Sequence, residues 1–213
     1  ELGSVTGPTG TIVLRQELPV INKAFEIDTA TRYALSASAD QSIVIDGSRI
    51  TSTRENTFVT QQTVEEGGVN GFEYQSGAST VLTPTPEEAT QSRISGLQIA
   101  GFEKGGAVVI DGASNLLVEG LTIGLDENDA SQAVKYGIHV TGASGATGPV
   151  TLLDNNIFSA SVFSDGASPL EGAGVLIDGT SQGVQVVGGA VGGAQQSNTS
   201  GVIVESSNDN TTR

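Results

Sequence analysis

Oxygen-bearing side chains are densest in one short run of the chain, Asp126-Glu127-Asn128-Asp129. Carboxylate and amide oxygens are the ligands that Ca²⁺ prefers in proteins, so Asp126, Glu127 and Asp129 form a candidate calcium site. The run lacks the glycine and the distal glutamate that an EF-hand loop would place beside such ligands. Two interpretations therefore stay open: a solvated acidic loop that needs no cofactor, or a calcium site.

A second group of acidic residues follows strand-like runs. Asp46, Asp111 and Asp178 each precede a glycine, and Glu205 ends a similar run. We expect these four carboxylates to stack at one corner of the fold, where they would either cap turns or bind a cation. Thr141 interrupts the row, and this favours turn capping.

His139 is the single histidine of the chain. A histidine that acts as a catalytic base needs a partner group that orients it, such as a carboxylate. Alignment of the repeats places Val109 and Leu176 on either side of His139, and both are apolar. We therefore expect a structural or interface role, with a pH-sensitive contact as the alternative.

The composition limits the classes of partner. Lys and Arg number 9 and Asp and Glu number 24, which gives a net charge of −15. Such a charge repels phosphate backbones, so no nucleic-acid partner is expected. Cysteine is absent, which excludes disulfides and thiolate metal sites, and no apolar run is long enough for a membrane span in this segment.

These residues are positioned by a pattern that recurs along the chain. The run Val108-Val109-Ile110-Asp111-Gly112 returns in degraded form, and a second run of apolar residues at i, i+2 and i+7 follows it. Self-similarity of this kind is typical of a repeat architecture. The copies of the first run begin at Ile43, Ile138, Val175 and Val202, and the second run begins at Leu116, Val150 and Val184.

The pattern resolves into three short strands per coil. Two corners are short turns, and Gly120 stands where a sharp corner requires a positive φ. The third link is long and variable, covering residues 125–135, 159–172 and 193–200. Coils stacked about 4.8 Å apart would pair their backbones and align Val118, Leu152 and Val186. The sequence therefore predicts an all-β, parallel β-helix solenoid with long loops at one corner.

Alternation within the first strand of each coil predicts an outer row of side chains. If Val108 and Ile110 point inward, the residue between them points outward. The expected outer row is mostly apolar, which is unusual for a sheet that faces water. Either the long loops fold over this face or another chain covers it, so we predict an interface formed by Val44, Val109, His139, Leu176 and Ile203.

Several runs together resemble the right-handed parallel β-helix repeat proteins of the pectin-lyase-like superfamily, of the large bacterial surface and secreted type. The resemblance implies the right-handed solenoid, which agrees with the crossover rule. It implies little about activity, because such proteins include lyases, hydrolases, adhesins and tail spikes. The runs that carry the resemblance are Ile12–Leu14, Leu18–Ile21, Ile45–Gly47, Ile94–Phe102, Gly106–Asn115 and Leu121–Asp126.

Polysaccharide lyases and hydrolases on a scaffold of this kind resemble one another in placing acids and bases side by side on one outer sheet, and the outward positions expected here include no carboxylate. We therefore predict a non-enzymatic, extracellular structural or adhesive module of a bacterial surface or filament-forming protein. The expected partners are further copies, adjacent domains of the same protein, or surface glycans. The alternative is a carbohydrate-active enzyme or a glycan-binding spike.

The expected domain organisation is a single β-helix segment over residues 1–213. Its coils are irregular over residues 1–92 and regular over residues 93–213, and residues 50–92 resist assignment. The chain does not begin with Met, so we expect it to be part of a larger protein.

Overall fold

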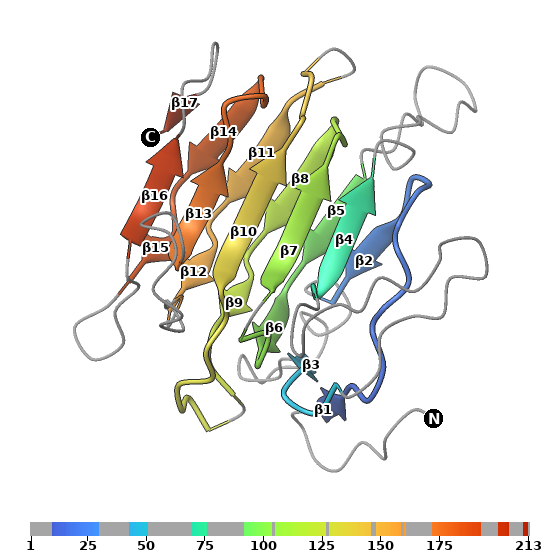
Figure 1. The fold of residues 1–213 in the computed structure, drawn as a ribbon, viewed down its shortest axis with the longest axis vertical. Helices are drawn as coiled ribbons and strands as arrows, with labels where there is room; N and C mark the ends of the chain where they lie inside the picture. The colour runs from blue at the N-terminus through green and yellow to red at the C-terminus, as the bar shows by residue number, and fades with distance from the viewer. Residues whose placement is uncertain are drawn as a thin grey trace.

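The computed structural model describes residues 10–29, 43–50, 70–75, 92–103, 105–126, 128–145, 148–158, 160, 172–192, 200–204 and 211–212. Every regular element among these residues is a short β-strand, and the strands assemble into three sheets (Figure 1). Consecutive strands along the chain enter different sheets, and neighbours within a sheet run parallel. The chain is thus an all-β, right-handed parallel β-helix, as predicted.

The three sheets are named here by their order within one regular coil, in which β7, β8 and β9 follow one another. Sheet I contains β4 (Phe72–Gln75), β7 (Gly106–Asp111), β10 (Tyr136–Thr141), β13 (Ala173–Ile177) and β16 (Ser200–Val204). Sheet II contains β2 (Glu26–Asp28), β5 (Ser92–Ser95), β8 (Leu116–Glu119), β11 (Val150–Leu153), β14 (Val184–Val187) and β17 (Thr211–Thr212). Sheet III contains β1 (Gly10–Val13), β3 (Ile43–Asp46), β6 (Leu97–Ala100), β9 (Thr122–Ile123), β12 (Asn156–Ile157) and β15 (Ala190–Val191).

Apolar side chains stack in columns inside the three sheets. Val118, Leu152 and Val186 pair in register across β8, β11 and β14, and all three belong to the buried core. This confirms the predicted column. Each strand is too short to bury a core alone, so burial comes from the coils above and below it.

The corner between sheets II and III is short and has a constant backbone geometry. Gly96, Gly120, Asp154 and Gly188 all have positive φ, between 51° and 69°. They stack from coil to coil, and the backbone amide of Gly120 donates to the Leu153 carbonyl, continuing the ladder around the corner. A left-handed residue at each level lets the chain turn sharply, as predicted for Gly120.

The links from sheet III to sheet I are the long ones. The chain leaves β9 at Ile123 and enters β10 at Tyr136, and it leaves β12 at Ile157 and enters β13 at Ala173. The link that follows β15 also runs until Ser200. Length variation therefore falls at this corner, as predicted.

One strand lies in a different sheet from the one predicted. β3, which contains Val44 and Asp46, pairs with β1 and β6 in sheet III. The prediction that Val44 shares an outer row with Val109, and that Asp46 stacks with Asp111, is therefore wrong. An Ile-Val-Ile-Asp-Gly run suits any of three similar faces, so its sheet is fixed by the pairing partners rather than by its composition.

Within the range that resisted assignment, the structure describes one strand. β4 places Phe72 and Tyr74 in the core, in register with Val108 and Ile110 of β7. Most of the predicted irregular region, residues 1–92, lies outside the described residues, so its division from the regular coils stays a prediction. Among the described residues, no helix has the length and apolar character needed to cross a membrane.

The column of inward residues that follows the left-handed corner changes in size along the solenoid. Leu97 and Leu121 fill it in two coils, and Asn155 and Gly189 occupy it in the next two. The Asn155 side chain is buried: its Oδ1 accepts from the Leu121 amide at 3.1 Å and its Nδ2 donates to the Val118 carbonyl at 3.0 Å. Asn155 therefore satisfies corner backbone groups that an apolar side chain would leave to other partners.

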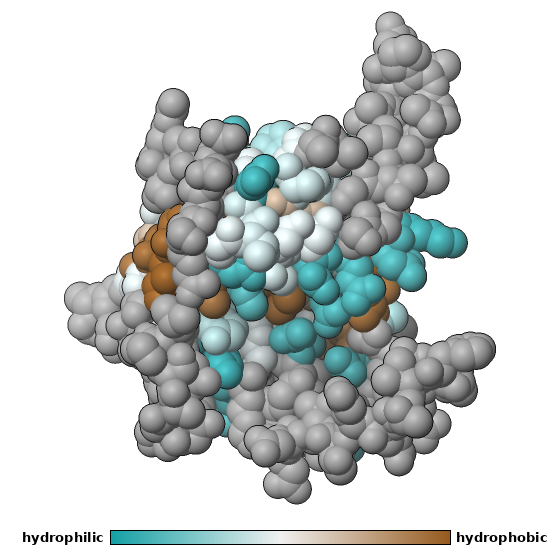
Figure 2. Space-filling view, turned by 45° about the horizontal axis from the view of Figure 1, so that its top comes forward, coloured by the Kyte–Doolittle hydropathy of each residue, from teal (hydrophilic) through white to brown (hydrophobic). Residues whose placement is uncertain are grey.

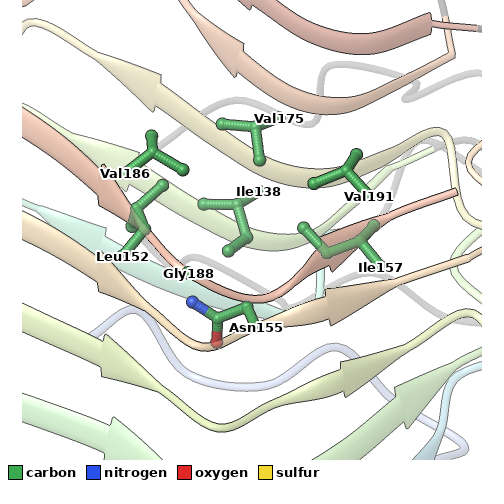
Figure 3. A pocket seen from close by; sticks show the side chains of 8 residues that line it. All are labelled: Ile138, Leu152, Asn155, Ile157, Val175, Val186, Gly188 and Val191. Carbon is green, nitrogen blue, oxygen red and sulfur yellow. The ribbon is translucent and has the colours of Figure 1, made fainter. Parts of the chain in front are cut away.

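A small cavity lies beside this side chain. Its volume is about 10 Å³, which matches a single water molecule. Figure 3 shows the Asn155 amide at its base and branched side chains from all three sheets around it. A Cβ on Gly189 would clash with the Asn155 carbonyl oxygen, so a larger residue cannot fill the space from that position.

We expect Asn155→Ala to lower the free energy of unfolding by about 2 kcal/mol, because it removes the partners of two buried backbone groups. Asn156→Ala is the matched control: Asn156 is the exposed neighbour in β12, and its loss should change stability by less than about 0.5 kcal/mol. Urea denaturation followed by circular dichroism measures both values. Equal effects of the two substitutions would contradict this role for Asn155.

The hydroxyl of Tyr74 is a polar group inside the core. Tyr74 is fully buried, and its Oη has no hydrogen-bond partner among the described residues. Burial raises the pKa of the Tyr74 phenol well above its ordinary value. Ionisation in the folded state is therefore suppressed, while the unfolded chain ionises near pH 10. The stability linked to this group is present below about pH 10 and is lost as the pH rises further.

We expect Tyr74→Phe to raise the free energy of unfolding by up to about 1 kcal/mol at neutral pH, because it removes a buried group without a partner. The variant should also lose part of the alkaline fall in stability above about pH 10. Tyr136→Phe, on the outer face of sheet I, is the control. Denaturation midpoints over this pH range give the result, and a clear loss of stability in Tyr74→Phe at neutral pH would refute the prediction.

Candidate functional site

The outer face of sheet I carries a group of chemically active side chains. Alternation along each strand turns one residue per coil away from the core, and these residues pair in register. Four of the five residues predicted for the interface lie in this outer row, and Glu73 of β4 adds a carboxylate to it. The row is Glu73, Val109, His139, Leu176 and Ile203.

Two apolar members of the row are already covered within a single chain. Val109 retains 7% of its accessible surface and Leu176 retains 6%, although neither belongs to the inner core cluster. His139 and Ile203 are half-buried. For Val109 and Leu176 the chain itself therefore provides most of the cover, and the binding of another chain to this face stays a prediction.

His139 lies against an aromatic ring from its own strand. The centroids of the Tyr136 and His139 rings are 5.2 Å apart, with an angle of 45° between the planes. The Nζ atom of Lys135 is 5.5 Å from the centroid of the Tyr136 ring, within reach of a cation–π contact. A cation, a phenol and an imidazole thus line up at the start of β10.

A second outer row runs beside the first and is polar. It contains Gln75, Asp111 and Thr141, which pair in register, and Asp178, which follows Ile177 on the next coil. Burial works to raise the pKa of the Asp178 carboxyl. Hydrogen bonds from Thr141 and Thr180, together with the nearby charge of His139, outweigh burial and hold that pKa below its ordinary value.

The acidic residues near His139 were not predicted from the sequence, for a geometric reason. Alternation along the strands indicates only the direct neighbours of His139, which are Val109 and Leu176. In a sheet the diagonal neighbours, two residues further along the adjacent strand, are also within reach of long side chains. Asp111 and Asp178 occupy those diagonal positions, so the expectation of an outer face without acids is wrong for sheet I.

The outer face of sheet II holds an ion pair. Nη2 of Arg93 donates to Oε2 of Glu119 at 2.8 Å, and Nη1 lies 3.8 Å from Oε1 of Glu26. Arg93, Leu117, Thr151 and Gln185 form an outward row in register, and Glu26 pairs with Arg93 on the preceding coil, so this face also carries an acid. All three charged side chains are partly exposed, so the pairs hold neighbouring coils together only modestly.

The candidate calcium residues are partly described. Oδ1 of Asp126 accepts from the backbone amides of Asn128 and Ala130, at 2.8 and 2.9 Å. Glu127 lies outside the described residues. Within the part of the chain that the structure describes, no group of three or more His, Cys, Asp or Glu side chains is placed to hold a metal ion. The calcium site stays a prediction.

The aspartates that precede glycines cap turns where their contacts are described. Oδ1 of Asp46 accepts from the Ser48 amide at 2.8 Å, and Oδ1 of Asp178 accepts from the Thr180 amide at 3.0 Å and its hydroxyl at 2.6 Å. These contacts support the turn-capping interpretation for both residues. Glu205, the last member of the predicted row, lies outside the described residues.

Comparison of the chain with protein-family models, with curated proteins and with solved structures gives no match.

We expect Asp178→Asn to weaken the dependence of stability on acid pH. Because the folded-state pKa is lowered, the carboxylate contributes stability above the unfolded pKa of about 3.9, and this is lost as the pH falls through the folded value. Asp111→Asn removes one charge from the same outer row and controls for net charge. Urea midpoints between about pH 7 and about pH 3 measure the slope. An unchanged slope in Asp178→Asn would show that its hydrogen bonds do not favour the charged form.

Proposed function

We propose that the chain is a non-enzymatic, extracellular structural or adhesive module of a bacterial surface or filament-forming protein. Its role is architectural: the coils form a stiff stack, and the stack presents outer faces and corner loops to partners. The observation that carries the proposal is the unbroken register of the core columns. Val118, Leu152 and Val186 repeat at one spacing, and the buried core continues on both sides of them.

A stack of this kind is suited to bearing load and to being extended. Each coil bonds only to its neighbours, so stability grows with every added coil and the outer faces are free to vary. The absence of cysteine and the net charge of −15 suit a secreted, soluble surface. The partners that we propose are further copies, adjacent domains of the same protein, and surface glycans.

A second candidate function is favoured by one observation. Asp111 and Asp178 lie on the same outer row, two coils apart, with Thr141 between them and His139 beside them. The two carboxyl groups of an inverting glycosidase are roughly 6.5–9.5 Å apart. Two coil spacings separate the backbones of the two residues by about 9.6 Å, close to the upper limit of the carboxyl separation in that class of enzyme. Asp178, whose pKa is lowered, would act as the base in such a carbohydrate-active enzyme.

Incubation with acidic and neutral polysaccharides, with and without Ca²⁺, separates the two functions. The structural proposal predicts no new reducing ends and no unsaturated uronate absorbance, and a glycan that binds should be recovered intact. The Asp111→Asn and Asp178→Asn variants serve as controls for any product that appears. Product that the wild type forms and both variants fail to form would overturn the structural proposal in favour of the enzyme.

A further inference from the structure

His139 lies between two carboxylates that come from the coils on either side of it. β10 pairs with β7 along one edge and with β13 along the other, and the three strands lie side by side in Figure 1. Val109 and Leu176 are the direct neighbours of His139. Asp111 stands two residues beyond Val109, and Asp178 stands two residues beyond Leu176. Each acid is therefore diagonal to the imidazole and within reach of it.

The carboxylate of Asp178 is held in place by hydrogen bonds. Its Oδ1 accepts from the Thr180 amide at 3.0 Å and from the Thr180 hydroxyl at 2.6 Å. Burial works to raise the pKa of this carboxyl, whereas hydrogen bonds from Thr141 and Thr180 and the charge of His139 lower it. The interaction is reciprocal, so an ionised Asp178 favours a charged His139 to the same extent. A carboxylate already fixed in position also loses little freedom when it attracts a cation.

The other carboxylates of this face are weaker partners for His139. Asp111 is exposed, so water screens its attraction. Glu73 lies in the same outer row as His139, but two coils away. His139 and Asp178 are both half-buried. Figure 2, which brings the top of Figure 1 forward, shows hydrophilic surface beside hydrophobic surface over the described part of the molecule. The pair of His139 and Asp178 is therefore less screened than the pair of His139 and Asp111.

The opposing charge near His139 is that of Lys135. The Nζ atom of Lys135 lies 5.5 Å from the centroid of the Tyr136 ring, and that centroid lies 5.2 Å from the centroid of the His139 ring. Both cations therefore approach the same aromatic ring, whose π electrons attract positive charge. The ring offsets part of the repulsion between Lys135 and a charged imidazole.

We propose that His139 forms a pH-dependent link between coils: its protonated imidazole attracts Asp178, and more weakly Asp111, and so strengthens the packing of β10 against β13 and β7. The stability that this link adds is fully present below about pH 6.5, where histidine is ordinarily charged, and is lost as the pH rises. The stack of coils is therefore more stable in mildly acidic surroundings than at neutral pH. This inference goes beyond the proposed function and does not depend on it.

Urea denaturation of the 213-residue chain between about pH 5.5 and about pH 7.5 tests the link. His139 is the single histidine and cysteine is absent, so no other side chain ordinarily changes its charge in this range. The urea midpoint of the wild type is expected to rise as the pH falls. The equilibrium constant for unfolding should decrease about two- to fivefold, as expected for a partly exposed ion pair. His139→Gln should abolish this change.

Two carboxylate variants identify the partner of the imidazole. Asp178→Asn removes the charge but keeps an acceptor for the Thr180 amide, and it should remove most of the pH-dependent change. Asp111→Asn, the matched control, removes a charge from the other diagonal position and should retain more than half of the change. The variant that combines His139→Gln with Asp178→Asn should show the same pH dependence as His139→Gln alone.

Three outcomes would overturn the link. The first is a wild-type midpoint that stays constant or falls as the pH falls, because the charged imidazole then gains nothing on folding. The second is a rise that persists in His139→Gln, because relief of the net charge of −15 would then explain it. The third is an equal loss in Asp111→Asn and Asp178→Asn. Circular dichroism melts establish that each variant folds, and His139→Asn replaces His139→Gln if the latter does not.

Discussion

The structure depends on parallel backbone pairing between consecutive coils. A strand such as β9 has only two residues, and no isolated strand of that length is stable. It persists because β6 and β12 bond to its two edges and because the inward Ile123 contacts Ile99 and Ile157 in the same column. The same backbone pairing sets the spacing of the outward side chains, including the row that carries His139.

The corners decide where the chain can vary. The short corner between sheets II and III must place a left-handed residue at each level, and Asp154 takes that position among glycines. Its neighbour Asn155 replaces the bulk of Leu121 with hydrogen bonds to the backbone. The long corner has no such requirement, and there the chain lengthens without breaking the register of β10 or β13. The corner with a fixed backbone geometry and the corner of variable length thus lie at different places in the coil.

Sequence patterns predict the features that backbone pairing between coils fixes. They do not predict the features that this pairing leaves undetermined. The column of Val118, Leu152 and Val186 was predictable because the same spacing of apolar residues, at i, i+2 and i+7, repeats in each of the three coils. The sheet that contains Val44 was not, since three faces accept the same apolar pattern and only the pairing with β1 and β6 separates them. The acids beside His139 were missed because they lie diagonally across strands, a relation that alternation along one strand does not reveal.

The two outer rows of sheet I make different demands on a partner. The outer face is polar in one row and largely covered in the other, where Val109 and Leu176 are already buried, so a partner there gains few apolar contacts. Burial of apolar area is the larger driving force for association, whereas polar contacts mainly give specificity. A partner that binds this face would therefore gain specificity from the polar row more than affinity from the apolar one.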